Sequence, residues 1–117
     1  MSDSIICEKS MTFAIRIVNL YKFLTTEKNE YVMSKNLLRC GTEIGAHAYE
    51  ACQGESRKDF STKMYVALKE ATATEYWLKL LLRTEFLTPF QAESMLNDCV
   101  ELKKILSSIT KTLKENS

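Results

Sequence analysis

The sequence predicts an all-α protein, a single domain folded as an up-down-up-down antiparallel four-helix bundle. Three observations lead to this prediction. The 117 residues include only three glycines and one proline, so long uninterrupted helices are expected. Apolar residues, 45% of the chain, return every three or four positions, which is the spacing of one helix face. Only short polar breaks interrupt the pattern, and short connections make neighbouring helices antiparallel.

The first helix is expected over residues 5–26, where a polar run that continues to residue 30 ends it. Its apolar residues are spaced by three, four or seven positions and therefore share one face. These residues are Ile6, Phe13, Ile17, Leu20 and Leu24. Charged residues fall mostly off this face, so the helix is predicted to cover a core with one side.

The second helix, residues 31–52, is predicted to approach a neighbouring helix closely. Gly41 and Gly45 are four positions apart, and a glycine inside a helix costs about 1 kcal/mol relative to alanine. Such a cost is usually accepted where two backbones come close together. Charged residues nearby exclude the membrane-spanning form of this spacing. The predicted buried face consists of Leu37, Gly41, Ile44, Ala48 and Ala51.

The third helix is expected over residues 57–83, after a break in which Gly54 adopts the left-handed conformation that ends a helix. Ser56 is expected to cap this helix, with Asp59 three residues later in a loose form of the capping box. The buried face is predicted to comprise Phe60, Met64, Ala67, Ala71, Thr74, Leu78 and Leu81.

Towards its C-terminal end the third helix becomes apolar around most of its circumference. A helix that is apolar all round is buried on more than one side, and in a four-helix protein a second buried side indicates a partner subunit. The candidate residues for this oligomer interface are Tyr76, Trp77, Leu80 and Leu82.

The fourth helix, residues 89–114, begins with a complete capping signal. Thr88 is in the capping position, Pro89 in the first turn, and Gln91 at the matching third position. Its predicted buried face comprises Ala92, Met95, Cys99, Leu102, Leu106, Ile109 and Leu113.

The charge balance does not favour a nucleic-acid binder that depends on bulk charge. Sixteen basic and fifteen acidic residues give a net charge of +1. Local basic groups are a solvated face by default, but an oligomer that repeats them around an axis could form an RNA- or DNA-binding surface. The candidates for such contacts are Arg57, Lys58, Lys63, Lys104 and Lys111.

One polar cluster resembles a metal site. Glu43, His47 and Glu50 share a face of the second helix, and Glu70 or Glu75 could complete a site from the third. The spacing equally suits a polar helix face or hydrogen-bonded interface residues, which are commoner. No cofactor is predicted.

Enzyme chemistry is not predicted. His47 is the single histidine, the cysteines form no CxxC pair, and no glycine-rich phosphate loop is present. The four cysteines are expected to be reduced thiols that fill the core as small residues, with disulfides as the alternative. The absence of a signal-peptide pattern and of a long apolar run favours a cytoplasmic protein that does not span a membrane.

Three segments resemble a known family: RCGTEIGAHAYEA (39–51), ESRKDFSTKMYVALKEA (55–71) and EYWLKLL (75–81). They are similar to the bacterial four-helix bundle proteins encoded in 23S rRNA intervening sequences, to which the accessory variability proteins of diversity-generating retroelements are related. Glu43, His47 and Ala73 depart from the family's Ser, Asn and Glu. The resemblance implies a homopentameric ring of bundles associated with RNA, DNA or a ribonucleoprotein, without catalysis. The alternative is a protein-interaction module with a partner that is not a nucleic acid.

Overall fold

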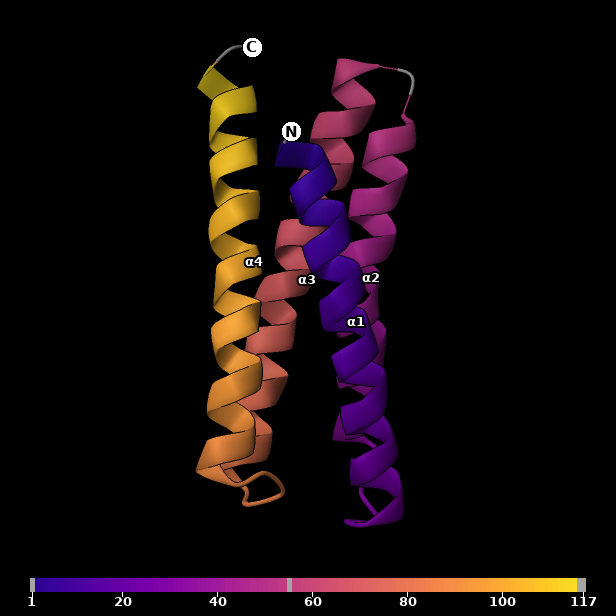
Figure 1. Cartoon of the computed structure of the whole chain (residues 1–117), viewed down its shortest axis with the longest axis vertical. Helices are drawn as coiled ribbons and strands as arrows, with labels where there is room; N and C mark the ends of the chain where they lie inside the picture. Colours follow the sequence, from indigo (N-terminus) through magenta and orange to yellow (C-terminus); the bar gives the residue numbers. More distant parts are fainter. Residues whose placement is uncertain (1, 55, 116–117) are drawn as a thin grey trace.

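The computed structural model describes residues 2–54 and 56–115 and consists of four long helices side by side (Figure 1). They are α1 (Ser2–Thr26), α2 (Met33–Gln53), α3 (Arg57–Arg83) and α4 (Pro89–Glu115). The described residues contain no strand, and the bundle measures 46 × 21 × 20 Å. The all-α prediction is confirmed. No helix among the described residues is long and apolar enough to cross a membrane.

Each helix packs on the one that follows it in the sequence, and the contact between α1 and α4 is the least extensive of those that hold the bundle together. The N-terminus, the C-terminal end of α4 and the connection between α2 and α3 lie at the same end of the molecule (Figure 1). The connections between α1 and α2 and between α3 and α4 lie at the opposite end.

The core forms from the faces that the apolar spacing predicts. On α2 all five predicted residues are buried, and on α3 all except the half-buried Phe60 are buried. Leu20 on α1 and Ile109 and Leu113 on α4 are half-buried, since they lie at the edges or ends of their faces. The largest fully buried side chains include Phe13, Ile17, Leu37, Met64, Leu78 and Leu102.

Both predicted N-terminal caps are present. The Ser56 hydroxyl accepts a hydrogen bond from the Asp59 backbone N–H at 3.0 Å. At α4 the Thr88 hydroxyl accepts from the Gln91 N–H at 3.2 Å, while the Gln91 side chain accepts from the Thr88 N–H at 2.9 Å. Two otherwise unpaired donors are thereby satisfied at the start of α4.

The prediction for Gly54 is wrong. Its φ is −65° and its ψ is 149°, an extended conformation that any residue can adopt. A glycine is needed here for space, because the Asp59 carboxylate and the Ala51 carbonyl oxygen would crowd a Cβ at this position. The carboxylate of the next helix, rather than a left-handed turn, therefore explains the glycine.

Helix α2 begins at Met33, two residues later than predicted, because Glu30 caps it. The Glu30 carboxylate accepts hydrogen bonds from the backbone N–H groups of Val32, Met33 and Ser34 at 3.2, 3.0 and 2.7 Å. Burial opposes ionisation of Glu30, which is 8% exposed, but these hydrogen bonds outweigh it and hold its pKa below the usual value.

The expectation that all four cysteines fill the core is only half right. Cys40 and Cys99 are buried, whereas Cys7 is half-buried and Cys52 is exposed. The periodicity fails for Cys52 because it lies in the last turn of α2, one position beyond the buried Ala51. None of the four is in a disulfide, so the prediction of reduced thiols agrees with the structure.

Candidate functional site: the polar seam between α2 and α3

A row of charged and polar side chains follows the line where α2 and α3 meet. Arg39, Glu43, His47 and Glu50 lie on successive turns of α2, because spacings of four and three return to the same side of a helix. Glu70 of α3 faces the middle of this row. We call these five residues the polar seam.

The seam is linked by short contacts across both helices. The Arg39 guanidinium lies 3.4 Å from Glu43 and 3.7 Å from Glu70, so it contacts both carboxylates. His47 Nε2 lies 3.9 Å from Glu43 Oε2, and its Nδ1 lies 3.3 Å from Glu50 Oε1. The His47 Nδ1 atom is shielded from solvent and has no hydrogen-bond partner among the described residues. The Glu50 carboxylate lies close to this atom but is not oriented to form a hydrogen bond with it.

The two carboxyl groups at the centre of the seam share a proton. Burial, the hydrogen bond with Glu43 and the Glu43 charge together raise the pKa of Glu70 to about 7. The hydrogen bond from Glu70 and the nearby Arg39 and His47 lower the pKa of Glu43. At neutral pH Glu70 is therefore protonated in only about half of the molecules, and the proton that it then shares with Glu43 joins α2 to α3.

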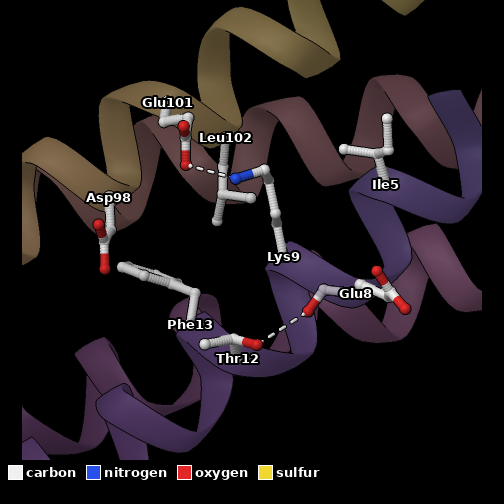
Figure 2. Close-up of a pocket in the computed structure, with 8 residues that line it drawn as sticks. All are labelled: Ile5, Glu8, Lys9, Thr12, Phe13, Asp98, Glu101 and Leu102. Atoms are coloured by element: carbon white, nitrogen blue, oxygen red, sulfur yellow. Dashed lines mark hydrogen bonds and ion pairs between the residues drawn. The ribbon is translucent and has the colours of Figure 1, made fainter.

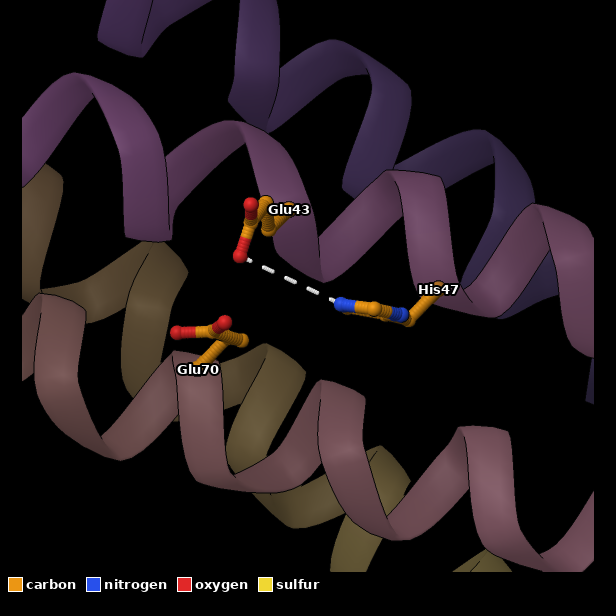
Figure 3. Close-up of side chains that lie close together, drawn as sticks. All are labelled: Glu43, His47 and Glu70. Atoms are coloured by element: carbon orange, nitrogen blue, oxygen red, sulfur yellow. Dashed lines mark ion pairs between the residues drawn. The ribbon is translucent and has the colours of Figure 1, made fainter.

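The structure changes the membership of the predicted metal cluster. Ligand atoms of Glu43, His47 and Glu70 lie within 4.8 Å of one another (Figure 3). Glu50 does not join this group, because it faces the other nitrogen of the imidazole. Arg39 and the shared proton already supply positive charge to the two carboxyls. The arrangement is therefore better suited to joining two helices than to binding a cation.

Glu75, the other residue considered for that cluster, is engaged elsewhere. Its carboxylate lies 2.7 Å from Lys103 of α4 and 3.3 Å from Lys79 of α3. The hydrogen bonds from these lysines lower its pKa despite partial burial. Glu75 therefore ties α3 to α4, one helix interface away from the polar seam.

A surface groove of about 490 Å³ lies between α1 and α4, where the helices pack least (Figure 2). Lys9 of α1 crosses it to reach Glu101 of α4 at 3.2 Å, and Phe13 and Leu102 form its floor. Farther along the same interface Arg16 binds both Asp98 and, at 2.8 Å, the Ser94 hydroxyl. The groove is thus spanned by ion pairs between α1 and α4.

The buried thiols are poor nucleophiles. Burial raises the pKa of Cys40, and burial together with the nearby Glu75 raises the pKa of Cys99 to about 12. Since the thiolate is the reactive form, these shifts make both thiols less reactive at neutral pH. His47, the single histidine, has no thiol among its contacts.

The sequence profile of the 23S rRNA-intervening sequence proteins matches residues 2–108. The chain belongs to this family. A solved relative is described as a protein with unknown function from the S23 ribosomal protein family of Bacteroides thetaiotaomicron. The two chains are 57% identical and superpose with a TM-score of 0.93, over 95% of this chain and 99% of that one. No curated protein matches the chain.

The four interface candidates of this family member differ in accessibility. Tyr76 is 60% exposed and meets the Trp77 ring edge-on, with centroids 5.2 Å apart. Trp77 and Leu82 are half-buried against the core, and Leu80 is also half-buried. Tyr76 is therefore the member most available to a partner subunit.

The basic candidates lie towards one end of this chain's bundle. Arg57 and Lys58 start α3 and Lys104 and Lys111 lie in the later half of α4, towards the end that holds the α2–α3 connection (Figure 1). All four are exposed. Lys63 differs, since it is half-buried and lies 3.4 Å from Glu50.

The groove residues and the Glu30 cap were not identified from the sequence. Lys9 and Glu101 are 92 positions apart, and no local spacing connects them. Glu30 does have a local signal, because an acidic residue just before a helix can accept its free N–H groups. The polar run 25–30 concealed that signal.

Proposed function

We propose that this chain is a non-catalytic, self-associating bundle that binds RNA as an accessory of a ribonucleoprotein. The observation that supports it best is the gathering of Arg57, Lys58, Lys104 and Lys111 at one end, here called the basic end. All four side chains are exposed to solvent. Each can therefore offer its charge to a phosphate group.

Self-association compensates for the low net charge of one chain. A net charge of +1 gives a single subunit little long-range attraction for RNA. A ring of five subunits, as the resemblance implies, would repeat the basic end five times around its axis. The exposed Tyr76 and the half-buried Leu80, one turn apart on α3, are the proposed contacts between subunits.

Within each subunit we infer the up-down-up-down antiparallel topology. Packing of each helix on its successor favours this order. So does the placement of the chain termini beside the α2–α3 connection (Figure 1). This topology brings the start of α3 and the end of α4 together, which the basic end requires.

Charge reversal at the basic end tests RNA binding. We expect the double variant K104E/K111E to bind a fluorescently labelled RNA about tenfold or more weakly than the unchanged protein, with a smaller salt dependence. The control K22E/K35E makes the same charge change at two exposed lysines outside the basic end. Equal losses of RNA affinity in both variants would show that RNA is attracted by net charge alone. If the unchanged protein did not bind RNA, the proposal would be refuted.

Light scattering after size exclusion tests self-association. We expect an oligomer, and we expect Y76S/L80S to shift it towards a monomer. Y49S removes a tyrosine of similar exposure from α2, 62% against 60%, and should leave the oligomer intact. A monomeric unchanged protein at micromolar concentration would contradict self-association, and dissociation by Y49S alone would place the interface on α2.

A second function, binding of a protein partner, is favoured by apolar side chains at the opposite end. Val32 is 71% exposed, Tyr31 59% and Phe90 85%. Exposed apolar groups near one another mark protein-interaction surfaces. Affinity capture with the unchanged protein and with V32S/F90S tests it. This function is supported if the unchanged protein captures a partner that V32S/F90S does not capture, while the mass of the oligomer stays the same. It is contradicted if the unchanged protein captures only further copies of itself.

A further inference from the structure

Two cysteines far apart in the sequence meet at the interface of α1 and α2. Cys7 lies near the start of α1 and Cys52 in the last turn of α2, 45 positions later. Their sulfur atoms are 3.0 Å apart. A disulfide bond is about 2.05 Å long, so a movement of roughly 1 Å would bring the two sulfurs to bonding distance.

The surrounding core fixes this meeting of the two thiols. Cys7 Sγ lies 3.6 Å from the carbonyl oxygen of Ala48, one helical turn before Cys52. Ala48 and Ala51 on α2 and Ile6 on α1 are 0%, 2% and 0% exposed. The pair therefore lies at the edge of well-packed helices, next to side chains that are fully buried.

Access to solvent distinguishes this pair from the other two cysteines. Cys52 is exposed and Cys7 half-buried, whereas Cys40 and Cys99 are both fully buried. A small oxidant can reach Cys52 from solvent, and Cys7 is next to it. The two buried thiols lack this access to solvent.

We propose that Cys7 and Cys52 form an oxidative modification site, at which a hydroperoxide converts the two thiols to a reversible intramolecular disulfide. In the first step the Cys52 sulfur attacks one oxygen of hydrogen peroxide; the O–O bond breaks, and a sulfenic acid and one water form. In the second step the Cys7 sulfur attacks the sulfenic sulfur and releases a second water. The two thiols together lose two electrons and two protons, and the peroxide is reduced to two waters.

The disulfide would secure the first helix. Helix α1 packs more extensively on α2 than on α4, and its contacts with α4 include the ion pairs of Lys9 and Arg16 across an open groove. A covalent bond between Cys7 and Cys52 closes a loop of 45 positions and restricts the unfolded chain. Oxidation is therefore expected to stabilise the folded bundle. This inference is independent of RNA binding.

The test uses the full chain, treated with a small excess of hydrogen peroxide and then alkylated at its remaining thiols. Mass spectrometry should show a loss of two protons and a Cys7–Cys52 crosslink. Trypsin leaves Cys40 and Cys52 together in peptide 40–57, so cleavage after Glu43 and Glu50 is needed to separate them. The melting temperature should rise by about 10 °C on oxidation and return after treatment with dithiothreitol.

Single variants supply the controls. C7S and C52S should each abolish both the crosslink and the rise in melting temperature, while C40A should retain both. If a variant fails to fold, the crosslink and the melting temperature of the unchanged protein still test the proposal. Overoxidation of Cys52 without a crosslink, crosslinks only between chains, or a crosslink without thermal stabilisation would each overturn the proposal.

Discussion

Ile17 of α1 occupies the space that a Cβ of Gly41 on α2 would need. A Cβ built on Gly41 would lie 2.8–2.9 Å from three carbon atoms of Ile17, whose side chain is fully buried. At Gly45 the nearest atom would be the Ser10 hydroxyl, at 3.3 Å. The two glycines therefore differ in how strictly they are required, although the sequence spacing treats them alike.

We predict that G41A destabilises the protein by up to about 2 kcal/mol. Overpacking against Ile17 costs about 1–3 kcal/mol, and the better helix propensity of alanine returns about 1 kcal/mol. G45A is the matched control, and its effect should be smaller because the Ser10 side chain can adjust. Urea denaturation followed by circular dichroism measures both. Equal stability of G41A and the unchanged protein would show that the close contact costs no more than the roughly 1 kcal/mol that alanine returns, and a more stable G41A would contradict the prediction.

We predict that E70Q makes the protein more stable at pH 8 and less dependent on pH between 4.5 and 7. The folded pKa of Glu70, about 7, lies above the ordinary glutamate value of 4.5. Its favourable contribution is therefore complete below pH 4.5 and is lost as the pH rises through 7. The loss in the unchanged protein is about 3 kcal/mol at most. Glu43, with its lowered pKa, acts in the opposite sense but only below pH 4.5.

Denaturant midpoints across this pH range measure the effect of E70Q. E93Q, at an exposed glutamate of α4, is a suitable control because it should leave the pH profile unchanged. If E70Q kept the same fall in stability from pH 4.5 to 7, another group would be responsible for the pH dependence.

We predict that E30Q destabilises the start of α2 by about 1–2 kcal/mol near neutral pH, because charged hydrogen bonds to three backbone N–H groups are weakened. The folded pKa of Glu30 is lowered, so its contribution is present above pH 4.5 and disappears as the pH falls through the folded value. The difference between E30Q and the unchanged protein should therefore vanish in acid. Thermal melting of both, with E27Q as an exposed control, tests this expectation.

We predict that removal of divalent metals with a chelator leaves the melting temperature unchanged. Arg39 contacts both Glu43 and Glu70, and their shared proton reduces the charge that a cation would require. Metal analysis of untagged protein provides a second readout. A stoichiometric transition metal, lost together with stability in H47A, would instead establish the cluster as a metal site.

The helical faces could be predicted because they depend on local spacing. The spacing of Phe13, Ile17 and Leu24 places them on one side of α1 independently of the other helices. Similarly, the capping signal of α4, formed by Thr88 and Gln91, is complete within four residues. The same locality explains why Glu43, His47 and Glu50 could be grouped in advance, although Arg39 was not placed with them.

The remaining features depend on the pairing of helices, which the sequence does not specify. Glu70 and Glu75 looked equivalent as partners of Glu43, yet Glu75 turns towards Lys103 of α4. Cys52 continued a core pattern but lies at an exposed helix end beside Cys7. A glycine at the position of Gly54 commonly indicates a left-handed turn. Here the glycine is required because the Asp59 carboxylate of the next helix would crowd a Cβ.

The central claim is that the assembled protein binds RNA through its basic end. The most direct measurement is the affinity of the oligomer for RNA between 50 and 200 mM salt. We expect the logarithm of the binding constant to fall linearly with the logarithm of salt concentration, at a slope that indicates several phosphate contacts per oligomer. The slope should decrease in K104E/K111E. Absence of binding at the lowest salt concentration, or binding that does not respond to salt, would contradict it.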